Sequence, residues 1–162
     1  MQELLPIAER IGALLKSRGE TIAVSESSTG GLMSAALLSV PGASAYYLGG
    51  AVVYTKKARE VLIDLPGEVL IEAQAQKPLS EPFVLLLGHA LRTEFASDWA
   101  LAEIGAAGPA GSRYGDSAGT GCLAIVGPNE ESLTIKTGSN DRVANMRAFA
   151  KAGLELLLKK IS

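Results

Sequence analysis

Three hydroxyl-bearing residues, Ser27, Ser28 and Thr29, stand before a Gly-Gly pair in the segment TIAVSESSTGGLMSAAL, which begins like a strand and ends like a helix. One interpretation is a helix N-cap by Ser28 or Thr29, with the glycines easing the turn. A second is an anion cradle, because the backbone N–H groups at a helix N-terminus bind phosphate. A third is a serine nucleophile, presented outward at the turn with N–H groups behind it that hold an oxyanion.

The turn matches neither of two common glycine motifs. Ser25 and Thr29 stand where the G-x-S-x-G nucleophile elbow has glycines. No Gly-Lys-Ser/Thr follows, so the segment is not a P-loop. The three interpretations therefore stay open on spacing alone.

A serine nucleophile needs a base. The only imidazole, His89, lies inside the helix-like run VLLLGHALRTEF, so we expect it to pack or meet solvent far from the turn. Lys56 and Lys57 follow Tyr54 and are alternative bases. Equally, KKARE is typical of a solvated helix face on which Lys56 pairs with Glu60.

A Gly-rich loop, GAAGPAGSRYGDSAG, occupies residues 105–119. It is either a flexible connector or a functional loop, since long loops in compact domains commonly carry function. Its N–H groups, together with Arg113, would suit a phosphate. Because no G-x-G-x-x-G occurs, the chain is not predicted to bind a dinucleotide.

Hydrophobic periodicity predicts the elements that position these segments. Helices are expected at 3–17, 31–39, 56–63 and 80–95, and strands at 21–26, 45–55 and 99–105. Gly19 is expected to end the first helix, Ser80 to cap the helix at 80–95, and the Gly49-Gly50 pair to mark a bulge or a close backbone approach. A hairpin follows at 120–126 and 132–138, and residues 64–79 are expected to be irregular. The last helix is capped by Asn140 or Asp141, and one face is expected to carry Val143, Met146, Phe149, Leu154, Leu157 and Ile161.

The interleaved helices and strands predict a layered α/β domain around a mixed, mostly parallel sheet. Parallel sheets bind ligands at the carboxyl ends of their strands. Three segments fall there: Ser27–Gly31, Tyr54–Arg59 and the Gly-rich loop. We expect them to converge on one rim.

Length and composition exclude several classes of protein. The 162 residues suit a single domain spanning 1–162, and 48% hydrophobic with 20% charged residues is typical of a globular chain. A net charge of −2 and 5% aromatic residues give no basis for binding nucleic acid or an anionic membrane. One cysteine, Cys122, expected to be buried, and one histidine exclude a disulfide and a Cys- or His-rich metal site. No signal peptide or membrane span is evident, which predicts a cytoplasmic protein.

Three segments together resemble a known family. SESSTGGLMSAALLSVPGASAYYLGGAVVYTKKA, GAAGPAG and AGTGCLAI, in this order, are similar to the C-terminal domain of the competence/damage-inducible protein CinA. The resemblance runs from the first helix to the last. It implies a three-layer α/β/α sandwich and a tendency to form homo-oligomers. The family also includes nicotinamide-nucleotide amidases.

The resemblance implies hydrolysis of the carboxamide of nicotinamide mononucleotide, giving nicotinate mononucleotide and ammonia without metal or organic cofactor. The resemblance implies Ser27 as the nucleophile and Tyr54 as an active-site residue; the further candidate catalytic residues are Lys56 and Arg59. It implies that Gly105, Gly108, Pro109 and Gly111 belong to a substrate loop; the further candidate substrate-binding residues are Ser28, Thr29, Gly30, Gly31 and Arg113. N–H groups around Ser28–Gly30 would hold the oxyanion.

The chain departs from the family pattern at several of these positions. Arg59 stands where the family has a lysine, and a guanidinium cannot act as a general base. Lys56, three residues earlier, would share nearly the same helix face. Ile104 replaces a threonine, Ser28 replaces a frequent cysteine, and Asp116 stands where a cation is usual.

Three functional hypotheses follow. The first is an amidase of the nicotinamide-nucleotide type with Ser27 as nucleophile. The second is a catalytically impaired family member that binds a nucleotide-like ligand without turnover. The third is an enzyme acting on a different amide or ester.

Overall fold

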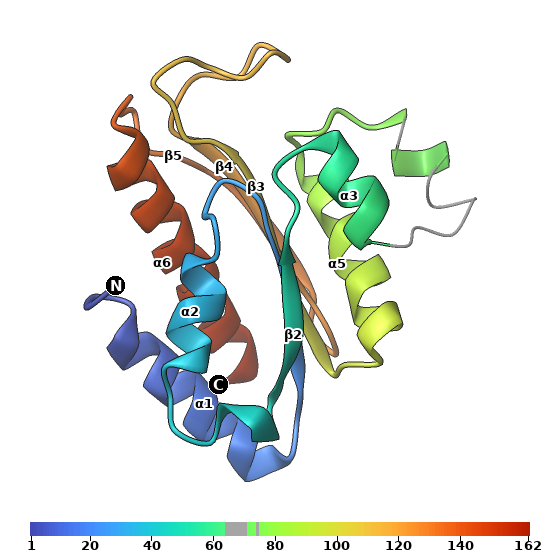
Figure 1. The fold of residues 1–162 in the computed structure, drawn as a ribbon, viewed down its shortest axis with the longest axis vertical. Coiled ribbons are helices and arrows are strands. Elements are labelled where there is room, and N and C mark those ends of the chain that lie inside the picture. Colours follow the sequence, from blue (N-terminus) through green and yellow to red (C-terminus); the bar gives the residue numbers. More distant parts are fainter. Residues whose placement is uncertain (64–70, 74) are drawn as a thin grey trace.

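A five-stranded mixed sheet forms the centre of the molecule (Figure 1). The computed structural model describes residues 1–63, 71–73 and 75–162. The strands are β1 (Ile22–Glu26), β2 (Tyr47–Val52), β3 (Trp99–Ala106), β4 (Thr120–Val126) and β5 (Glu131–Lys136), in the order β2-β1-β3-β4-β5. β1 pairs in parallel with β2 and β3, whereas β3–β4 and β4–β5 are antiparallel. The mixed sheet is confirmed, but its parallel share is smaller than predicted, because the hairpin adds two antiparallel pairings.

Helices cover both faces of this sheet, which confirms the three-layer α/β/α arrangement (Figure 1). One face carries α1 (Leu5–Arg18), α2 (Leu32–Leu38) and α6 (Arg142–Ile161). The other carries α3 (Lys56–Leu62) and α5 (Glu81–Phe95), and a short 3₁₀ turn, Ala43–Ala45, precedes β2. In the described part of the chain, no helix is both long and apolar enough to cross a membrane.

Several helix ends lie at the residues that the sequence marks. Gly19 ends α1 in the left-handed conformation, Ser80 accepts a hydrogen bond from Phe83 N at the start of α5, and Asp141 accepts one from Ala144 N at the start of α6. The expected irregular stretch 64–79 is wrong in part, since residues 71–73 and 75 are helical. Ile, Glu and Ala at 71–73 tolerate a helix well, which here outweighs the nearby Pro signals. Residues 64–70 and 74 of that stretch lie outside the described residues.

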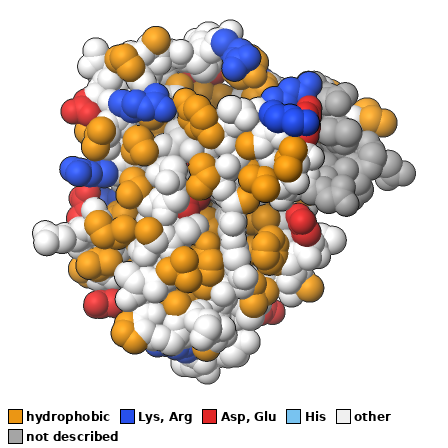
Figure 2. All heavy atoms as spheres, in the orientation of Figure 1, with side chains coloured by type: hydrophobic (Ala, Val, Ile, Leu, Met, Phe, Trp, Pro, Cys, Tyr) orange, Lys and Arg blue, Asp and Glu red, His pale blue; other side chains and the backbone are white. Residues whose placement is uncertain are grey.

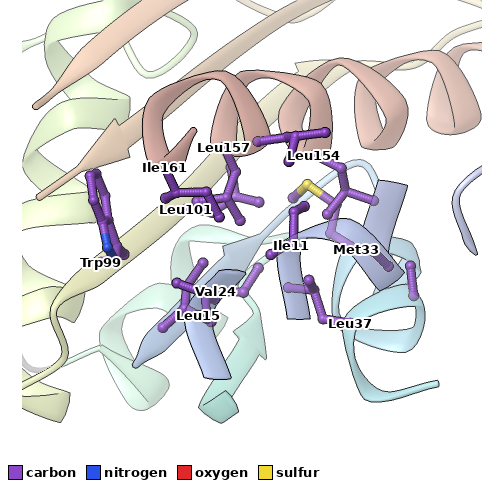
Figure 3. Close-up of a cluster of buried hydrophobic side chains, with 14 of the residues drawn as sticks. Ile11, Leu15, Val24, Met33, Leu37, Trp99, Leu101, Leu154, Leu157 and Ile161 are labelled. Atoms are coloured by element: carbon purple, nitrogen blue, oxygen red, sulfur yellow. The ribbon is translucent and has the colours of Figure 1, made fainter. Parts of the chain in front are cut away.

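The larger hydrophobic core lies between the sheet and the layer of α1, α2 and α6 (Figure 3). Helix side chains from three directions meet the sheet there: Ile11, Leu15, Met33, Leu37, Leu154, Leu157 and Ile161 against Val24, Trp99 and Leu101. On the opposite face α5 packs on small residues, including the buried Cys122, as expected. Burial of these side chains supplies the main force holding the layers together.

Two glycines in β2 allow the chain to approach β1 closely. The register between the strands shifts between Ile22 and Ala23, which marks a bulge. A Cβ at Gly50 would lie 2.5 Å from the carbonyl oxygen of Val24, so only glycine fits there. The Gly49-Gly50 pair was expected to mark a bulge or a close backbone approach, and the close approach at Gly50, beside the shift in register, confirms this.

Phe149 of α6 anchors the last helix on the carboxyl end of β3. The ring is fully buried and lies over Gly105 and Gly121, which pair directly across β3 and β4. A Cβ at Gly105 would be 2.8 Å from the ring, and one at Gly121 would be 2.9 Å away. The ring therefore fills the space left by two absent side chains.

Val143 does not belong to this buried face, contrary to the expectation, and its side chain is 55% exposed. Asn145, two residues later, is buried. At 3.6 residues per turn, two positions lie about 200° apart around the helix. Val143 and Asn145 therefore point to nearly opposite sides.

We predict that Phe149→Ala lowers the free energy of unfolding by about 3–5 kcal/mol, because it leaves a cavity against two glycines that cannot fill it. Urea denaturation at neutral pH measures the loss. Val143→Ala on the same helix is the control and should change the free energy by less than about 0.5 kcal/mol. Equal losses in both variants would contradict this packing.

Candidate active site

Ser27 lies at the carboxyl end of β1, in the lining of a cavity of about 380 Å³. The three segments expected to converge do meet there. The residues that line the cavity are Ser27, Tyr54, Thr55, Lys56, Arg59, Pro78, Leu79, residues 104–114 and Arg142. The predicted residues Gly105, Gly108, Pro109, Gly111 and Arg113 are thus all brought to one cavity.

The turn after β1 is organised by Glu26, the last residue of that strand. Its fully buried carboxylate accepts hydrogen bonds from the amides of Gly31, Met33 and Ser34 at 2.7–3.1 Å, and from the Ser34 hydroxyl at 2.6 Å. Neither Ser28 nor Thr29 caps α2, so the N-cap interpretation is wrong. One carboxylate at the strand end reaches several orphan amides of the first turn, more than a single hydroxyl could.

A second fully buried carboxyl group, that of Glu103 of β3, lies beneath the same turn. It accepts hydrogen bonds from the amides of Ser27 (2.9 Å) and Thr29 (3.1 Å), and one of its oxygens lies 2.8 Å from the Thr29 hydroxyl oxygen. The Ser28 hydroxyl makes a very short contact with its other oxygen. Complete burial raises the pKa of Glu103, although these hydrogen bonds oppose the rise. The cradle predicted for an external anion is filled by the protein's own carboxyl group.

Only part of the turn is left for a ligand. Ser28, Thr29, Gly30 and Gly31, predicted to bind substrate, do not line the cavity. The Gly30 amide donates to the Ser27 carbonyl at 3.3 Å, and the amides on either side are bonded to the two carboxylates. Within the described residues, the Ser28 amide has no acceptor. It is the backbone amide of the turn that is left without a hydrogen bond among the described residues.

Three arginines, Arg59, Arg113 and Arg142, give the cavity a positive wall. Most of the Lys and Arg side chains visible in Figure 2 lie in the upper half of the view. Arg59 lies 5.4 Å from the centre of the Phe83 ring, and burial lowers the pKa of its guanidinium, which nonetheless stays charged. Arg113 lies against Tyr114. No acidic side chain lines the cavity among the described residues.

Arg142, at the start of α6, is the cavity cation that the sequence did not reveal. It donates to the carbonyl of Gly108 at 2.6 Å and to the Tyr54 hydroxyl at 3.0 Å. Its guanidinium also lies 5.8 Å from the centre of the Tyr54 ring. Arg142 thereby joins two of the three predicted segments.

None of the three bases considered from the sequence hydrogen-bonds Ser27 among the described residues, and Lys57 does not line the cavity. Lys56 lines the cavity, but its side chain is 76% exposed and lies 3.8 Å from Glu60, the predicted i,i+4 pairing. His89 lies in α5 and pairs with Glu130 at 3.0 Å, away from the cavity as predicted. Among the described residues, none hydrogen-bonds the Ser27 hydroxyl.

Hydrogen bonds within the Gly-rich loop and to Lys77 give the loop a defined conformation. Asp116 accepts hydrogen bonds from Lys77 (2.5 Å) and from the Ser112 hydroxyl (2.6 Å), and the Ser112 amide donates to the Asp116 carbonyl at 2.8 Å. Gly108 has φ +107°, and a Cβ there would lie 2.8 Å from the Asn140 carbonyl oxygen. The unexpected negative charge of Asp116 is therefore used inside the loop.

No metal centre is formed by this arrangement. Across residues 1–63, 71–73 and 75–162, no group of three or more His, Cys, Asp or Glu side chains is placed to hold a metal ion. The two carboxyl groups that lie close together, Glu26 and Glu103, are occupied by amides and hydroxyls of the turn.

Sequence inspection missed Glu26, Glu103 and Arg142. A signal existed for the two carboxylates, because each interrupts or ends an apolar strand-like run, TIAVSE and WALAEIG. A carboxylate is rarely buried without dedicated donors, so such a residue indicates a built polar site. Arg142 had no such signal, since its approach to the cavity depends on where α6 begins.

Comparisons with known proteins all match this chain to the same family. The sequence profile of the CinA C-terminal domain matches residues 4–161. A CinA-like protein from Gloeobacter violaceus is 34% identical over 157 residues, covering 96% of this chain and 36% of its own length. One from Synechococcus sp. is 41% identical over 114 residues, covering 70% and 26%. The chain spans 26–36% of the length of the curated relatives it matches.

Solved structures agree with these matches. A CinA superfamily protein from Klebsiella pneumoniae superposes with a TM-score of 0.87 at 26% identity, covering 98% of this chain and 97% of the other. A competence/damage-inducible protein from Agrobacterium tumefaciens gives 0.85 at 26% identity, with coverage of 96% and 94%. These relatives are therefore similar in length as well as in fold.

Asp116 accepts hydrogen bonds from Lys77 and Ser112, an arrangement that we call the Asp116 clamp. The clamp should make the stability of the fold depend on pH. Partial burial raises the pKa of Asp116, but the hydrogen bonds from Lys77 and Ser112 outweigh this and hold it below its usual range. The clamp thus stabilises the fold above the unfolded pKa of about 3.9, and its contribution is lost as pH falls through the native value. Asp116→Asn should lower the free energy of unfolding by about 0.5–1 kcal/mol at neutral pH and by nothing measurable in strong acid. Urea denaturation of both proteins at the two pH values tests this; an equal difference at both would rule out the clamp.

Proposed function

The chain belongs to the family of the CinA C-terminal domain, and we propose that it hydrolyses the carboxamide of nicotinamide mononucleotide to nicotinate mononucleotide and ammonia. The observation that carries the proposal is that Ser27 lines a cavity whose wall holds three arginines. A nucleotide offers both an amide for the serine and a phosphate for the guanidinium groups, which bind phosphate in bidentate geometry. The cavity volume, about 380 Å³, is in the range of small-molecule sites.

In the proposed reaction, Ser27 Oγ attacks the amide carbon and the Ser28 N–H donates to the developing oxyanion. The C–N bond breaks, the nitrogen takes up a proton and leaves as ammonia, and an acyl-enzyme remains. Water then attacks the ester carbon and releases the carboxylate product and the free serine. Tyr54, whose oxygen accepts from Arg142, keeps its own hydroxyl proton for a ligand.

The proton of Ser27 needs an acceptor. Lys56 is the cavity-lining amine, and reaching Ser27 requires it to leave Glu60. Breaking such an exposed pair costs less than about 1 kcal/mol, so the pair is no obstacle to the movement. Arg59 stays protonated and is assigned to holding negative charge.

Binding of a nucleotide-like ligand without turnover is the alternative. It is favoured by one observation: none of the described residues hydrogen-bonds the Ser27 hydroxyl, and the amides of Ser27 and Thr29 are already bonded to Glu103. Under this alternative the arginine wall still binds phosphate. Turnover and binding must therefore be measured separately.

We predict that the purified protein releases ammonia from nicotinamide mononucleotide and that Ser27→Ala reduces kcat by about 10³-fold or more while the ligand still binds. An enzyme-coupled ammonia assay and calorimetric titration measure the two quantities. Binding without ammonia release from the wild type would favour the alternative. Neither binding nor release would reject both.

We also predict that Arg142→Ala weakens binding of nicotinamide mononucleotide about 10- to 100-fold, because a charged hydrogen-bond donor to the phosphate is lost. Arg147→Ala is the matched control, since Arg147 is an exposed residue of the same helix and does not line the cavity. Titration with nicotinamide riboside, which has no phosphate, separates the two roles of Arg142. If Arg142→Ala weakens both ligands equally, Arg142 does not hold the phosphate.

A further inference from the structure

Two carboxyl groups and three hydroxyl groups form one buried network behind Ser27. Four close oxygen–oxygen contacts connect them. Glu103 contacts the hydroxyls of Ser28 and Thr29, and Glu26 contacts those of Thr29 and Ser34. Thr29 Oγ1 lies 2.8 Å from an oxygen of each carboxyl group and so joins the two.

The number of protons in this network is constrained. Each of the four contacts needs one proton between its two oxygens, because two bare lone pairs at this distance repel. The hydroxyls of Ser28, Thr29 and Ser34 supply three. The Thr29 hydroxyl can donate to one carboxyl group only, so the fourth proton has to come from a carboxyl group at the Thr29 bridge.

The two carboxyl groups have different surroundings, and the difference favours Glu103 as the group that carries the proton. Glu26 accepts three backbone amides, whereas Glu103 accepts two. No Lys, Arg or His in the described part of the chain forms an ion pair with either group. The neighbour of Glu103 on β4 is the uncharged Leu123, and α6 covers this end of β3 with Phe149. Glu26 on β1 is thus the titratable group that faces Glu103, and burial disfavours two charges side by side. Glu26 in turn faces Tyr47 of β2, whose pKa is raised by burial and by the charge of Glu26, so the Tyr47 phenol adds no charge near neutral pH.

We propose that Glu103 is a positioning residue for Ser27 that shares one proton with Glu26 through Thr29. The shared proton leaves the pair with a single negative charge, and the uncharged partner lets Glu103 stay under the turn and fix the Ser27 and Thr29 amides. Loss of the proton sets two carboxylates against each other across Thr29 and loosens the turn. The expected effect on turnover rests on the proposed function, whereas the shared proton does not depend on that function.

The proposal predicts the direction in which the stability of the fold changes with pH. Burial raises the pKa of Glu103, so the native protein keeps a proton there that the unfolded chain releases near the ordinary glutamate pKa of about 4.3. Stability from this proton is therefore complete in acid below that value and falls as pH rises toward the native pKa. This direction is opposite to that expected for Asp116.

Infrared spectroscopy of the wild-type protein at neutral pH tests the proton directly, because a protonated carboxyl group has a C=O band distinct from carboxylate bands. We expect one buried carboxylic-acid band that persists at neutral pH and disappears in Glu103→Gln. Glu81→Gln is the matched control, since the Glu81 carboxylate also accepts two hydroxyls, from Ser132 and Thr134, but is only half-buried. That variant should keep the band. Absence of the band in the wild type would overturn the proposal without any variant having to fold.

Thermal unfolding gives a second readout. Between about pH 6 and pH 9 the wild-type melting temperature should fall more steeply than that of Glu103→Gln, whose neutral amide cannot ionise. Equal slopes would contradict the shared proton. If the protein turns over nicotinamide mononucleotide, the alkaline decline of kcat should also be smaller in Glu103→Gln. If it does not, the spectroscopic result still decides the proposal, so the two can fail independently.

Discussion

The burial of two carboxyl groups inside the sheet is the constraint on which the site depends. Glu26 and Glu103 lie side by side on β1 and β3, with no exposure to water. A buried ionised carboxyl group is very costly unless it is fully hydrogen-bonded. The turn of residues 27–34 provides those donors, five backbone amides and three hydroxyls. The need to satisfy Glu26 and Glu103 therefore sets the start of α2 and the presentation of Ser27.

The same constraint separates charge within the site. The inner end of the turn is occupied by the protein's own acidic groups, so an anionic ligand gains nothing there. The cations Arg59, Arg113 and Arg142 lie along the cavity wall. A ligand with one neutral and one anionic end would therefore bind in a single orientation, with its neutral end at Ser27. This polarity results from residues on four separate segments, none of which shows it alone.

Periodicity and end signals predicted most of the fold, because they act locally. Gly19, Ser80 and Asp141 ended or began helices as predicted, and the Gly49-Gly50 pair marked the bulge. The resemblance to the CinA C-terminal domain predicted both the three-layer α/β/α arrangement and the membership of that family. The site was less predictable, since Arg142 meets Tyr54 across 88 residues and Glu103 meets Ser27 across 76. Lys77 likewise neutralises Asp116 through a contact that no local pattern encodes.

The packing of Phe149 on Gly105 and Gly121 makes α6 a rigid spacer between the core and the cavity. Arg142 lies seven residues before Phe149, two helical turns or about 10 Å along the axis. If the Phe149 ring moved slightly against Gly105 and Gly121, the guanidinium of Arg142 would move by a similar distance, because a helix is stiff over two turns. A substitution at Gly121, which does not line the cavity, would therefore move Arg142 while leaving every residue of the cavity lining unchanged. The position of a charge at the cavity wall thus depends partly on packing in the core.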